Sequence, residues 1–153
     1  MPEAAAHKIV AQNRKARHEY HILDTWETGM VLQGTEVKSL RQGKANLADA
    51  YARLDRGELW LYNLHISPYE QGNRFNHDPL RPRKLLMHTS ELRKLVGQVE
   101  QKGLTLVPLD IHFTRGIAKV NLALVRGKKL HDKRETLRER AEQRDAQRAA
   151  KDD

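Results

Sequence analysis

The sequence predicts a mainly β domain, α+β by content, in which antiparallel strands close into a small barrel. Three features predict this fold: at least five stretches alternate apolar and polar residues, hairpin-type turns join most of them, and only one stretch has firm helical spacing. Because no crossover helices separate the strands, a parallel sheet is disfavoured. The 153 residues suit one domain of ordinary size.

The first elements read as an arm followed by a strand. Residues 1–18 are small, polar and basic, and we expect a basic N-terminal arm. Apolar residues at even spacing over 20–26 are typical of a half-buried strand, and Gly29 breaks this pattern. Residues 34–43, GTEVKSLRQG, fit either a strand that bends or a short helical turn, and the pattern does not decide between them.

A hairpin and a long loop follow. Two alternating runs flank Asp55-Arg56-Gly57, where glycine supplies the positive φ of a tight turn. The alternation places six apolar side chains on two faces: Trp60, Tyr62, Leu64 and Ile66 on one, and Leu59 and Leu61 on the other. Residues 67–84 contain three prolines and no periodicity, which predicts a long loop.

The convincing helix lies in HTSELRKLVGQVEQKG. Either Thr89 or Ser90 can cap it, and Gly103 ends it. Its apolar residues at helical spacing are Leu92, Leu95, Val96 and Val99. Two strands then follow, LTLVPLDIHF and IAKVNLALV, joined across residues 114–116. In the second strand, Ala118, Val120, Leu122 and Leu124 alternate with Lys119, Asn121, Ala123 and Val125.

Composition points to a polyanionic partner. The formal net charge of +8 favours nucleic acid first and an anionic membrane second, with a merely basic protein as the alternative. The absence of cysteine excludes disulfides and thiolate metal sites and fits a reducing compartment. No apolar run approaches the roughly 20 residues that span a bilayer, and no secretory signal is visible, so we expect a cytoplasmic protein.

Catalytic and cofactor motifs are missing from the pattern. Gly29 and Gly34 have the spacing of a phosphate-binding loop, but Thr35-Glu36 follow where that loop needs lysine and a hydroxyl. The eight histidines show no ligand spacing, so no metal and no cofactor are expected. The acids Asp24, Glu27, Glu36 and Asp49 allow a paired carboxylate site in principle, although scattered acids are usually solvated. We therefore do not expect an enzyme.

Several basic clusters favour RNA binding instead. NRKARH at 13–18 combines cations with hydrogen-bonding side chains, RPRK at 81–84 borders the long loop, Lys119 projects between apolar strand neighbours, and RGKK begins at Arg126. Guanidinium groups hold phosphates in bidentate fashion and stack on bases. Each cluster alone is more simply a solvated face, but together they favour an RNA-binding barrel.

The blocks NRKARHEY, LQGTEVKSLRQGKANLADAY, RPRKLL, GLTLVPL and KVNLALVRGKKLHDKR, taken in order, resemble the SsrA-binding protein (SmpB) family, the bacterial partner of tmRNA. The resemblance runs from about residue 7 to 134. It implies an OB-like barrel over 19–126 with accessory helices. It also implies a non-enzymatic trans-translation factor that binds the tRNA-like part of tmRNA and brings it to ribosomes stalled on truncated mRNA. The expected partners are tmRNA and the ribosome, with no membrane, and the chain is expected to be a monomer.

The resemblance also assigns residues to two surfaces. The implied RNA-binding residues are Arg14, Arg17, His18, Glu27, Leu86 and Lys119. The implied ribosome-binding tail motif is Gly127, Lys128, Lys129, His131, Asp132, Lys133 and Arg134. An exposed Leu86 can pack on an unstacked base. From the pattern alone, however, that leucine is at least as well explained as a core residue.

The last 28 residues, 126–153, contain ten Lys or Arg, seven Asp or Glu, and two large apolar side chains. Such a segment cannot bury enough apolar surface to offset its ordering entropy, so the tail from 127 to 153 is expected to be disordered when free. Arg140, Arg144 and Arg148 lie at four-residue spacing. Beside ribosomal RNA, phosphates would neutralise this row, and we expect the tail to become helical there. The resemblance implies that the tail occupies the decoding region and the empty mRNA channel.

Two rival functions remain open at this point. One is an RNA-processing enzyme that uses a carboxylate pair on the barrel and cleaves RNA with a divalent metal. The other is a general ribosome-associated basic protein, which would bind tRNA-like RNA and duplex RNA equally well.

Overall fold

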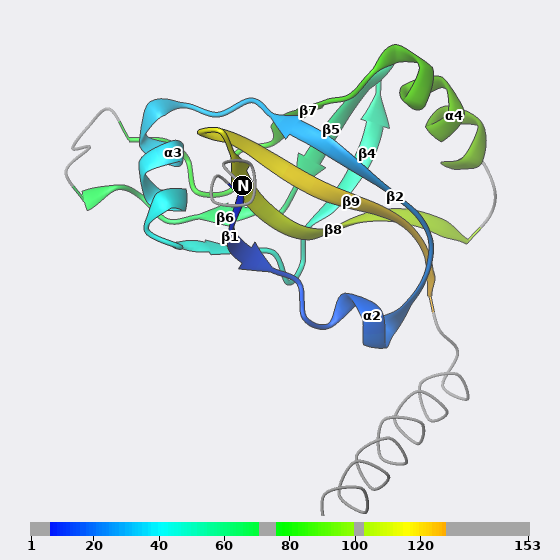
Figure 1. The fold of residues 1–153 in the computed structure, drawn as a ribbon, viewed down its shortest axis with the longest axis horizontal. Helices are drawn as coiled ribbons and strands as arrows, with labels where there is room; N and C mark the ends of the chain where they lie inside the picture. Colours follow the sequence, from blue (N-terminus) through cyan, green and yellow to red (C-terminus); the bar gives the residue numbers. More distant parts are fainter. Residues whose placement is uncertain (1–6, 71–75, 100–102, 128–153) are drawn as a thin grey trace, which may run out of the picture.

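The computed structural model describes residues 7–70, 76–99 and 103–127 of the chain (Figure 1). The strands are β1 (His7–Gln12), β2 (Tyr20–Met30), β3 (Ala45–Asn46), β4 (Tyr51–Asp55), β5 (Glu58–Tyr62), β6 (His65–Ile66), β7 (Arg83–Leu86), β8 (Leu104–Thr114) and β9 (Ile117–Gly127). The helices are α2 (Ala16–Glu19), α3 (Gly34–Arg41) and α4 (Thr89–Val99). In the parts of the chain that the structure describes, no helix is long and apolar enough to cross a membrane.

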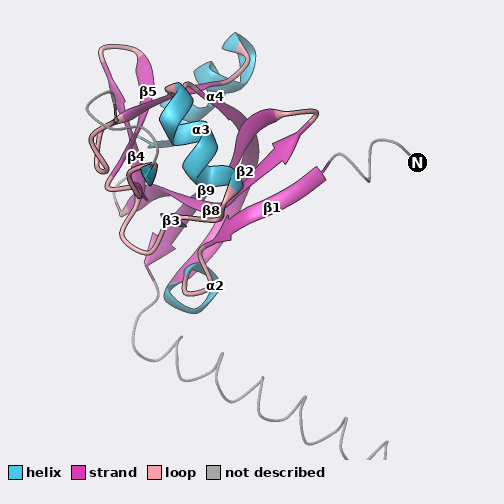
Figure 2. Cartoon of the chain, turned by 90° about the vertical axis from the view of Figure 1, so that its left-hand side faces the viewer, coloured by secondary structure: helices cyan, strands magenta, loops and turns pink. Residues whose placement is uncertain are grey.

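The main sheet closes on itself. Its seven strands follow the order β1-β8-β4-β5-β7-β2-β9, and β8 also pairs with β9, so six of the strands form a ring with β1 added at the outside of β8. Every pairing in it is antiparallel. The predicted mainly β fold with a closed antiparallel sheet is therefore confirmed, and Figures 1 and 2 show the strands wrapping around one interior.

Both predicted hairpin turns are present. Arg56 and Gly57 have φ values of 53° and 78° between β4 and β5, and Arg115 and Gly116 have 53° and 79° between β8 and β9. Two successive residues with positive φ match the twist of antiparallel strands. Gly57 thus has the positive φ that the sequence predicts, and Gly116 has the same role in the second turn. In both turns the preceding arginine also has a positive φ, which is less favourable for a residue with a side chain.

The two predicted faces are confirmed within β5, but the predicted extension of the Trp60 and Tyr62 face to Leu64 and Ile66 is wrong. Leu59 and Leu61 are the buried residues of β5, whereas Trp60 and Tyr62 are only half-buried. The alternation does not continue into the next segment, because Asn63 leaves the strand with a φ of 60°. Leu64 and Ile66 therefore reach the core without sharing a face with Trp60 and Tyr62. Arg53 covers the outer ring of Tyr62 at 5.0 Å.

The stretch left open by the sequence is a helix. Gln33 precedes α3, and the Glu36 side chain accepts a hydrogen bond from the Gln33 backbone N–H at 2.8 Å. Together with the bond that the Gln33 side chain accepts from the Glu36 backbone, this contact forms a capping box. An acid three residues after the N-cap therefore stabilises the start of the helix. In α4, only Leu95 is fully buried, and Val96 is exposed, contrary to its predicted place in the apolar stripe. Gly103 follows with a φ of 86°.

The predicted arm of residues 1–18 differs from the structure over its described part. Residues 7–12 form β1, which pairs with β8 along 7–12 and 110–114. Asn13 then ties the chain to β8, because its backbone N–H donates to the Leu109 carbonyl at 2.8 Å. The basic segment is thus held against the sheet at its start, and Arg14 follows directly after this anchor.

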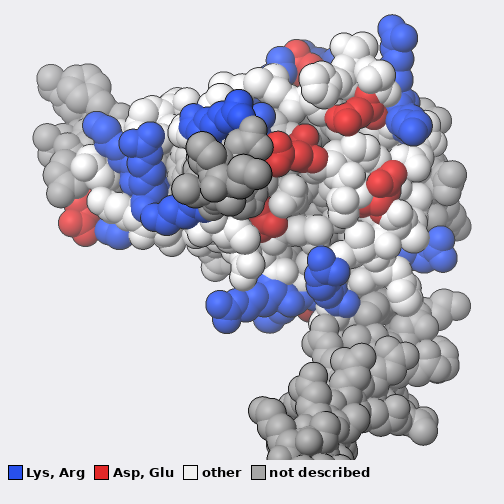
Figure 3. Space-filling model, viewed as in Figure 1, with Lys and Arg blue, Asp and Glu red and all other residues white. Residues whose placement is uncertain are grey.

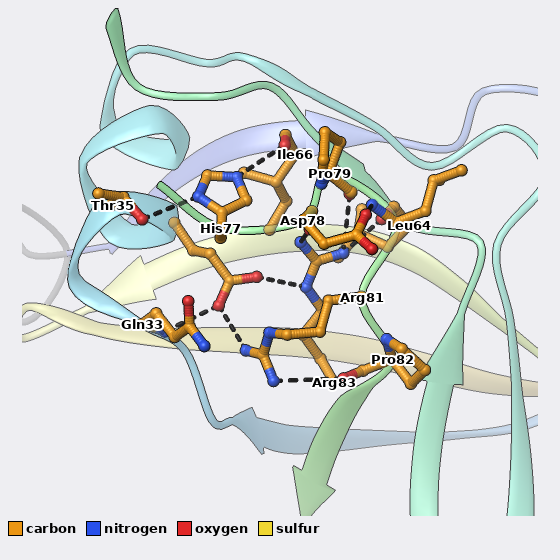
Figure 4. Close-up of polar contacts among 12 residues, drawn as sticks. Gln33, Thr35, Leu64, Ile66, His77, Asp78, Pro79, Arg81, Pro82 and Arg83 are labelled. Carbon is orange, nitrogen blue, oxygen red and sulfur yellow. Dashed lines mark hydrogen bonds and ion pairs between the residues drawn. The ribbon is translucent and has the colours of Figure 1, made fainter. Parts of the chain in front are cut away.

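A buried ion-pair network joins α3 to the loop before β7 (Figure 4). The Glu36 carboxylate accepts hydrogen bonds from Arg81 and from Arg83, the latter at 2.6 Å from Nε, and the side chains of Glu36 and Arg83 are fully buried. Arg83 also donates to the Leu64 carbonyl. In the same loop, His77 donates from Nε2 to the Ile66 carbonyl of β6 at 2.8 Å.

This network corrects two sequence predictions. Glu36 is not a solvated acid, and Arg83 is not an exposed RNA-binding cation. Burial alone would raise the pKa of Glu36, but the hydrogen bond from Arg81, that from the Gln33 backbone and the charge of Arg83 bring this pKa below the ordinary carboxyl value. Burial lowers the pKa of Arg83, but a guanidinium stays protonated in proteins. The cluster at 81–84 is therefore mainly structural.

Candidate nucleic-acid interface

Three of the predicted RNA-binding residues come from three strands and lie on one outer face of the ring. Strand pairing sets Gly29 of β2 opposite Leu86 of β7 on one side and Lys119 of β9 on the other. Glu27 is two residues before Gly29, so it projects from the same face. The buried neighbours of these β2 residues, Trp26 and Thr28, face the opposite side. The structure thus brings Glu27, Leu86 and Lys119 together.

Leu86 is exposed on this face. Half of its surface is accessible to solvent, so the alternative that it is an ordinary core residue is wrong. A Cβ on Gly29 would lie 3.6 Å from the Leu86 Cβ, which is ordinary van der Waals contact. The glycine therefore leaves an open strip of backbone between an apolar side chain and a cation. An unstacked base can pack on such an apolar side chain while its phosphate meets the lysine.

A polar network borders this strip. In the strand register, Glu27 of β2 lies opposite Asn121 of β9, and Asn121 lies opposite Asp110 of β8. His112 lies between the two acids, with its Nε2 hydrogen-bonded to Glu27 Oε2 at 3.0 Å and its Nδ1 to Asp110 Oδ1 at 2.8 Å. Asn121 Nδ2 donates to Asp110 Oδ2 at 2.8 Å. The acids bind opposite nitrogens of one ring and do not converge on a point, and the described ranges hold no group of three or more metal-binding side chains.

A hollow of about 430 Å³ adjoins the network. It is lined by Gln12, Asn13, Arg14, Arg17, Thr25, Leu109, Asp110 and Asn121. Arg14 and Arg17 are exposed, so the hollow joins two predicted RNA-binding cations to the face that carries Glu27. His18 is half-buried in α2 and is not among the residues that line the hollow. Of the three predicted residues in the basic block, two therefore line this hollow.

Charge is unevenly distributed over the molecule. Figure 3 shows Lys and Arg side chains over α3 and around α2, with acidic side chains between them over β2 and β9. The cations of α3 were not predicted from sequence: Lys38 lies 5.4 Å from the ring centre of Tyr69, and Arg41 lies 5.8 Å from that of Phe113. Lys38 and Arg41 are three residues apart, which places them on one side of a helix. This spacing could have indicated a basic surface only if the stretch had been predicted to be helical.

The tail motif lies almost entirely outside the described residues. Gly127 is the last residue of β9, is exposed, and pairs with Tyr20. The other predicted tail residues, Lys128, Lys129, His131, Asp132, Lys133 and Arg134, fall beyond the part of the chain that the structure describes. Their roles stay predictions.

Known proteins similar to this chain agree with one another. The family model described as SmpB protein matches residues 10–152. The SsrA-binding protein of Desulforudis audaxviator is 63% identical over 144 residues, which cover 94% of each chain. That of Synechococcus elongatus is 59% identical over 152 residues, 99% of each chain. A solved structure described as "tmRNA-SmpB: a journey to the center of the bacterial ribosome" matches at 60% identity and a TM-score of 0.67, covering 78% of this chain and 85% of that chain.

Proposed function

Because the chain belongs to the SmpB protein family, we propose that it is the RNA-binding adaptor of trans-translation. In this role it binds the tRNA-like domain of tmRNA and delivers it to ribosomes stalled on truncated mRNA. The relatives named as SsrA-binding proteins and the structural match to a tmRNA-SmpB complex support both partners. The chain acts as a monomer in the cytoplasm, where the ribosomes are, and we assign it no catalytic residue.

The observation that carries this proposal is the outer face made by β2, β7 and β9. Lys119 offers a point charge for a phosphate, Leu86 an apolar surface for a base, and Glu27 an acceptor for a base edge. Arg14 and Arg17 extend the positive charge along the adjoining hollow. Folded RNA with exposed loop bases fits such a face better than a regular duplex, whose base edges are hidden in a deep groove.

We propose separate roles for the sheet and for the C-terminal segment. Residues 19–126 form the RNA-binding body, although β1 shows that the preceding segment contributes to the same sheet. We propose that residues 127–153 act separately, as the segment that enters the decoding region and the vacant mRNA channel. Lys128, Lys129 and the group from His131 to Arg134 are the candidate ribosome contacts.

The RNA that the protein carries in cells provides the direct test. We expect a tagged chain, recovered under gentle conditions and followed by sequencing of its RNA, to be enriched in tmRNA over tRNA and ribosomal RNA fragments. In competition at physiological salt, the tRNA-like domain should displace tmRNA, whereas generic duplex RNA should not. Equal competition by the two RNAs would instead indicate a general basic protein, and metal-dependent cleavage of the bound RNA would indicate a nuclease.

Substitutions on the outer face should weaken tmRNA binding without unfolding the domain. For Lys119→Ala we expect weaker binding and a salt dependence that is shallower by about one unit, because one phosphate contact is lost. Glu27→Ala should weaken binding with little change in that slope, since it removes an acceptor and not a cation. Titration of labelled tRNA-like RNA at several salt concentrations measures both effects.

The matched control is Arg53→Ala. Arg53 is exposed on β4, which the strand order places across the ring from β2 and β9. Its removal deletes one positive charge from the far side, so both the affinity and the slope should stay close to those of the parent. Parent-like binding by Lys119→Ala and Glu27→Ala at every salt concentration would show that the interface lies elsewhere.

A further inference from the structure

We propose that His112, held by Asp110, is a positioning residue that orients the Glu27 carboxylate for recognition of RNA. The inference rests on the proposed function, because it assigns a task within the RNA-binding face. It concerns residues that neither the spacing nor the basic clusters of the sequence indicate.

Burial shows that His112 has to act through another residue. Its side chain is fully buried, that of Asp110 is 17% exposed, and that of Glu27 is 51% exposed. RNA at the surface can therefore reach Glu27 but cannot touch the histidine ring. Of the two acids that the ring contacts, Glu27 is much the more exposed.

Strand register explains how the side chains meet. His112 is paired with Lys119, and Lys119 with Gly29, while Asp110 is paired with Asn121, and Asn121 with Glu27. Glu27 and His112 thus lie diagonally, on strands separated by β9. Their side chains meet across β9, between those of Lys119 and Asn121. Asp110 and His112 share this face because they are two residues apart on β8.

The hydrogen bonds of this network hold one oxygen of the Glu27 carboxylate. His112 contacts the two acids through its two ring nitrogens, Nε2 toward Glu27 and Nδ1 toward Asp110. Asn121 in turn fixes Asp110. In Glu27, Oε2 contacts His112, and because the side chain is 51% exposed, the carboxylate can also accept from an amino, imino or 2′-hydroxyl group of RNA.

Such a carboxylate is oriented before RNA arrives. A glutamate on an exposed strand otherwise samples several rotamers, and binding has to select one of them. The bond from His112 restricts that choice in the free protein, which is how preorganisation raises affinity. Loss of the bond should therefore weaken RNA binding even though no RNA contact is deleted.

A pair of near-isosteric substitutions separates the two contacts of the ring. In His112→Gln the amide nitrogen takes the place of Nε2 and can still donate to Glu27, whereas in His112→Asn it takes the place of Nδ1 and reaches only Asp110. With the tRNA-like domain as the probe, we expect His112→Gln to bind within about twofold of the parent and His112→Asn to bind about tenfold more weakly, equivalent to about 1.4 kcal/mol.

A double-mutant cycle tests whether the effect passes through Glu27. In the Glu27→Ala background, His112→Asn should change the affinity by less than about twofold, because the residue that it positions is already absent. An equal loss in both backgrounds, or equal losses for His112→Gln and His112→Asn that follow their thermal stabilities, would overturn the inference and indicate a purely structural histidine. If the parent itself fails to bind the tRNA-like domain, the proposed function fails. If the parent binds and only the His112 effects are missing, this inference alone fails.

Discussion

Glu36→Ala will lower the free energy of unfolding by about 3–5 kcal/mol, the cost of breaking a buried ion pair from one side. The reason lies in what remains after the substitution. Arg83 is fully buried, and without Glu36 its guanidinium keeps only the carbonyls of Leu64, Asp78 and Pro79 as partners. A buried charge without a counterion is far more costly than the small contact area that the alanine loses. Urea denaturation of parent and variant measures the difference.

A surface pair in the same protein provides the control. Glu58 and Lys84 are 3.4 Å apart, with side chains 47% and 38% exposed. Because water already solvates both charges, Glu58→Ala should change the stability by about 0–1 kcal/mol. If Glu36→Ala proves as mild as Glu58→Ala, the buried network does not stabilise the junction of α3 with the loop before β7.

Low pH should reduce the difference in the free energy of unfolding between the parent and Glu36→Ala. The pKa of Glu36 in the folded protein is lowered, with burial opposing and the two arginines favouring the charged form. Ionised Glu36 therefore stabilises the fold fully above the pKa of an unfolded carboxyl, about 4.3, and this contribution is lost as the pH falls below that value. Glu36→Ala lacks the contribution at every pH. The stability gap between parent and variant should accordingly narrow in denaturation series run from pH 7 to pH 3.

Removing the residues after Leu130 will abolish tagging on stalled ribosomes and leave tmRNA binding within about twofold of the parent, because the loss of distant charges contributes little at physiological salt. The truncation does not change the net charge of the protein. Residues 131–153 contain seven Lys or Arg and seven Asp or Glu, so the truncated chain keeps the formal net charge of +8. A failure to tag would therefore reflect the lost segment and not a weaker general attraction to RNA.

Lys119→Ala serves as the comparison in the same assay. It should reduce tagging through weaker tmRNA binding, so excess protein should restore it, whereas no excess should restore the truncated chain. Tagging is measured on a reporter mRNA without a stop codon. Full tagging by the truncated protein would remove the proposed role of the tail, and a loss of tmRNA binding as large as that of Lys119→Ala would place the tail at the tmRNA interface instead.

Local patterns predicted the strands and turns of this fold because they depend on near neighbours. The alternation in β9 and the glycines at 57 and 116 sufficed for two hairpins. The arginines at 81 and 83 could not be interpreted in this way, since their counterion, Glu36, is 45 and 47 residues away. A basic cluster next to a loop has the same appearance whether it binds RNA or a buried acid.

The interface was predictable only in part. Lys119 is conspicuous because it is a cation between apolar strand residues, and the resemblance to the family pointed to Glu27 and Leu86. His112 could not be found from sequence, because its contact with Glu27 depends on the register of β2, β9 and β8. Residues 7–12 were misread for the opposite reason: their composition suits an arm, but the unpaired side of β8 offers them a partner.

The pairing of β2 with β9 has a consequence for how the protein is made. Trp26 lies opposite Leu122, and Glu27 lies opposite Asn121. The first long strand of the chain therefore pairs along most of its length with the last strand. During synthesis, β2 has no complete partner until β9 has left the exit tunnel, and pairings this distant in sequence form slowly. A nascent chain interrupted before residue 117 lacks both Lys119 and the strand that closes the ring. Such a chain can form neither the closed ring nor the complete outer face, so we expect competence to bind RNA only after β9 has been made.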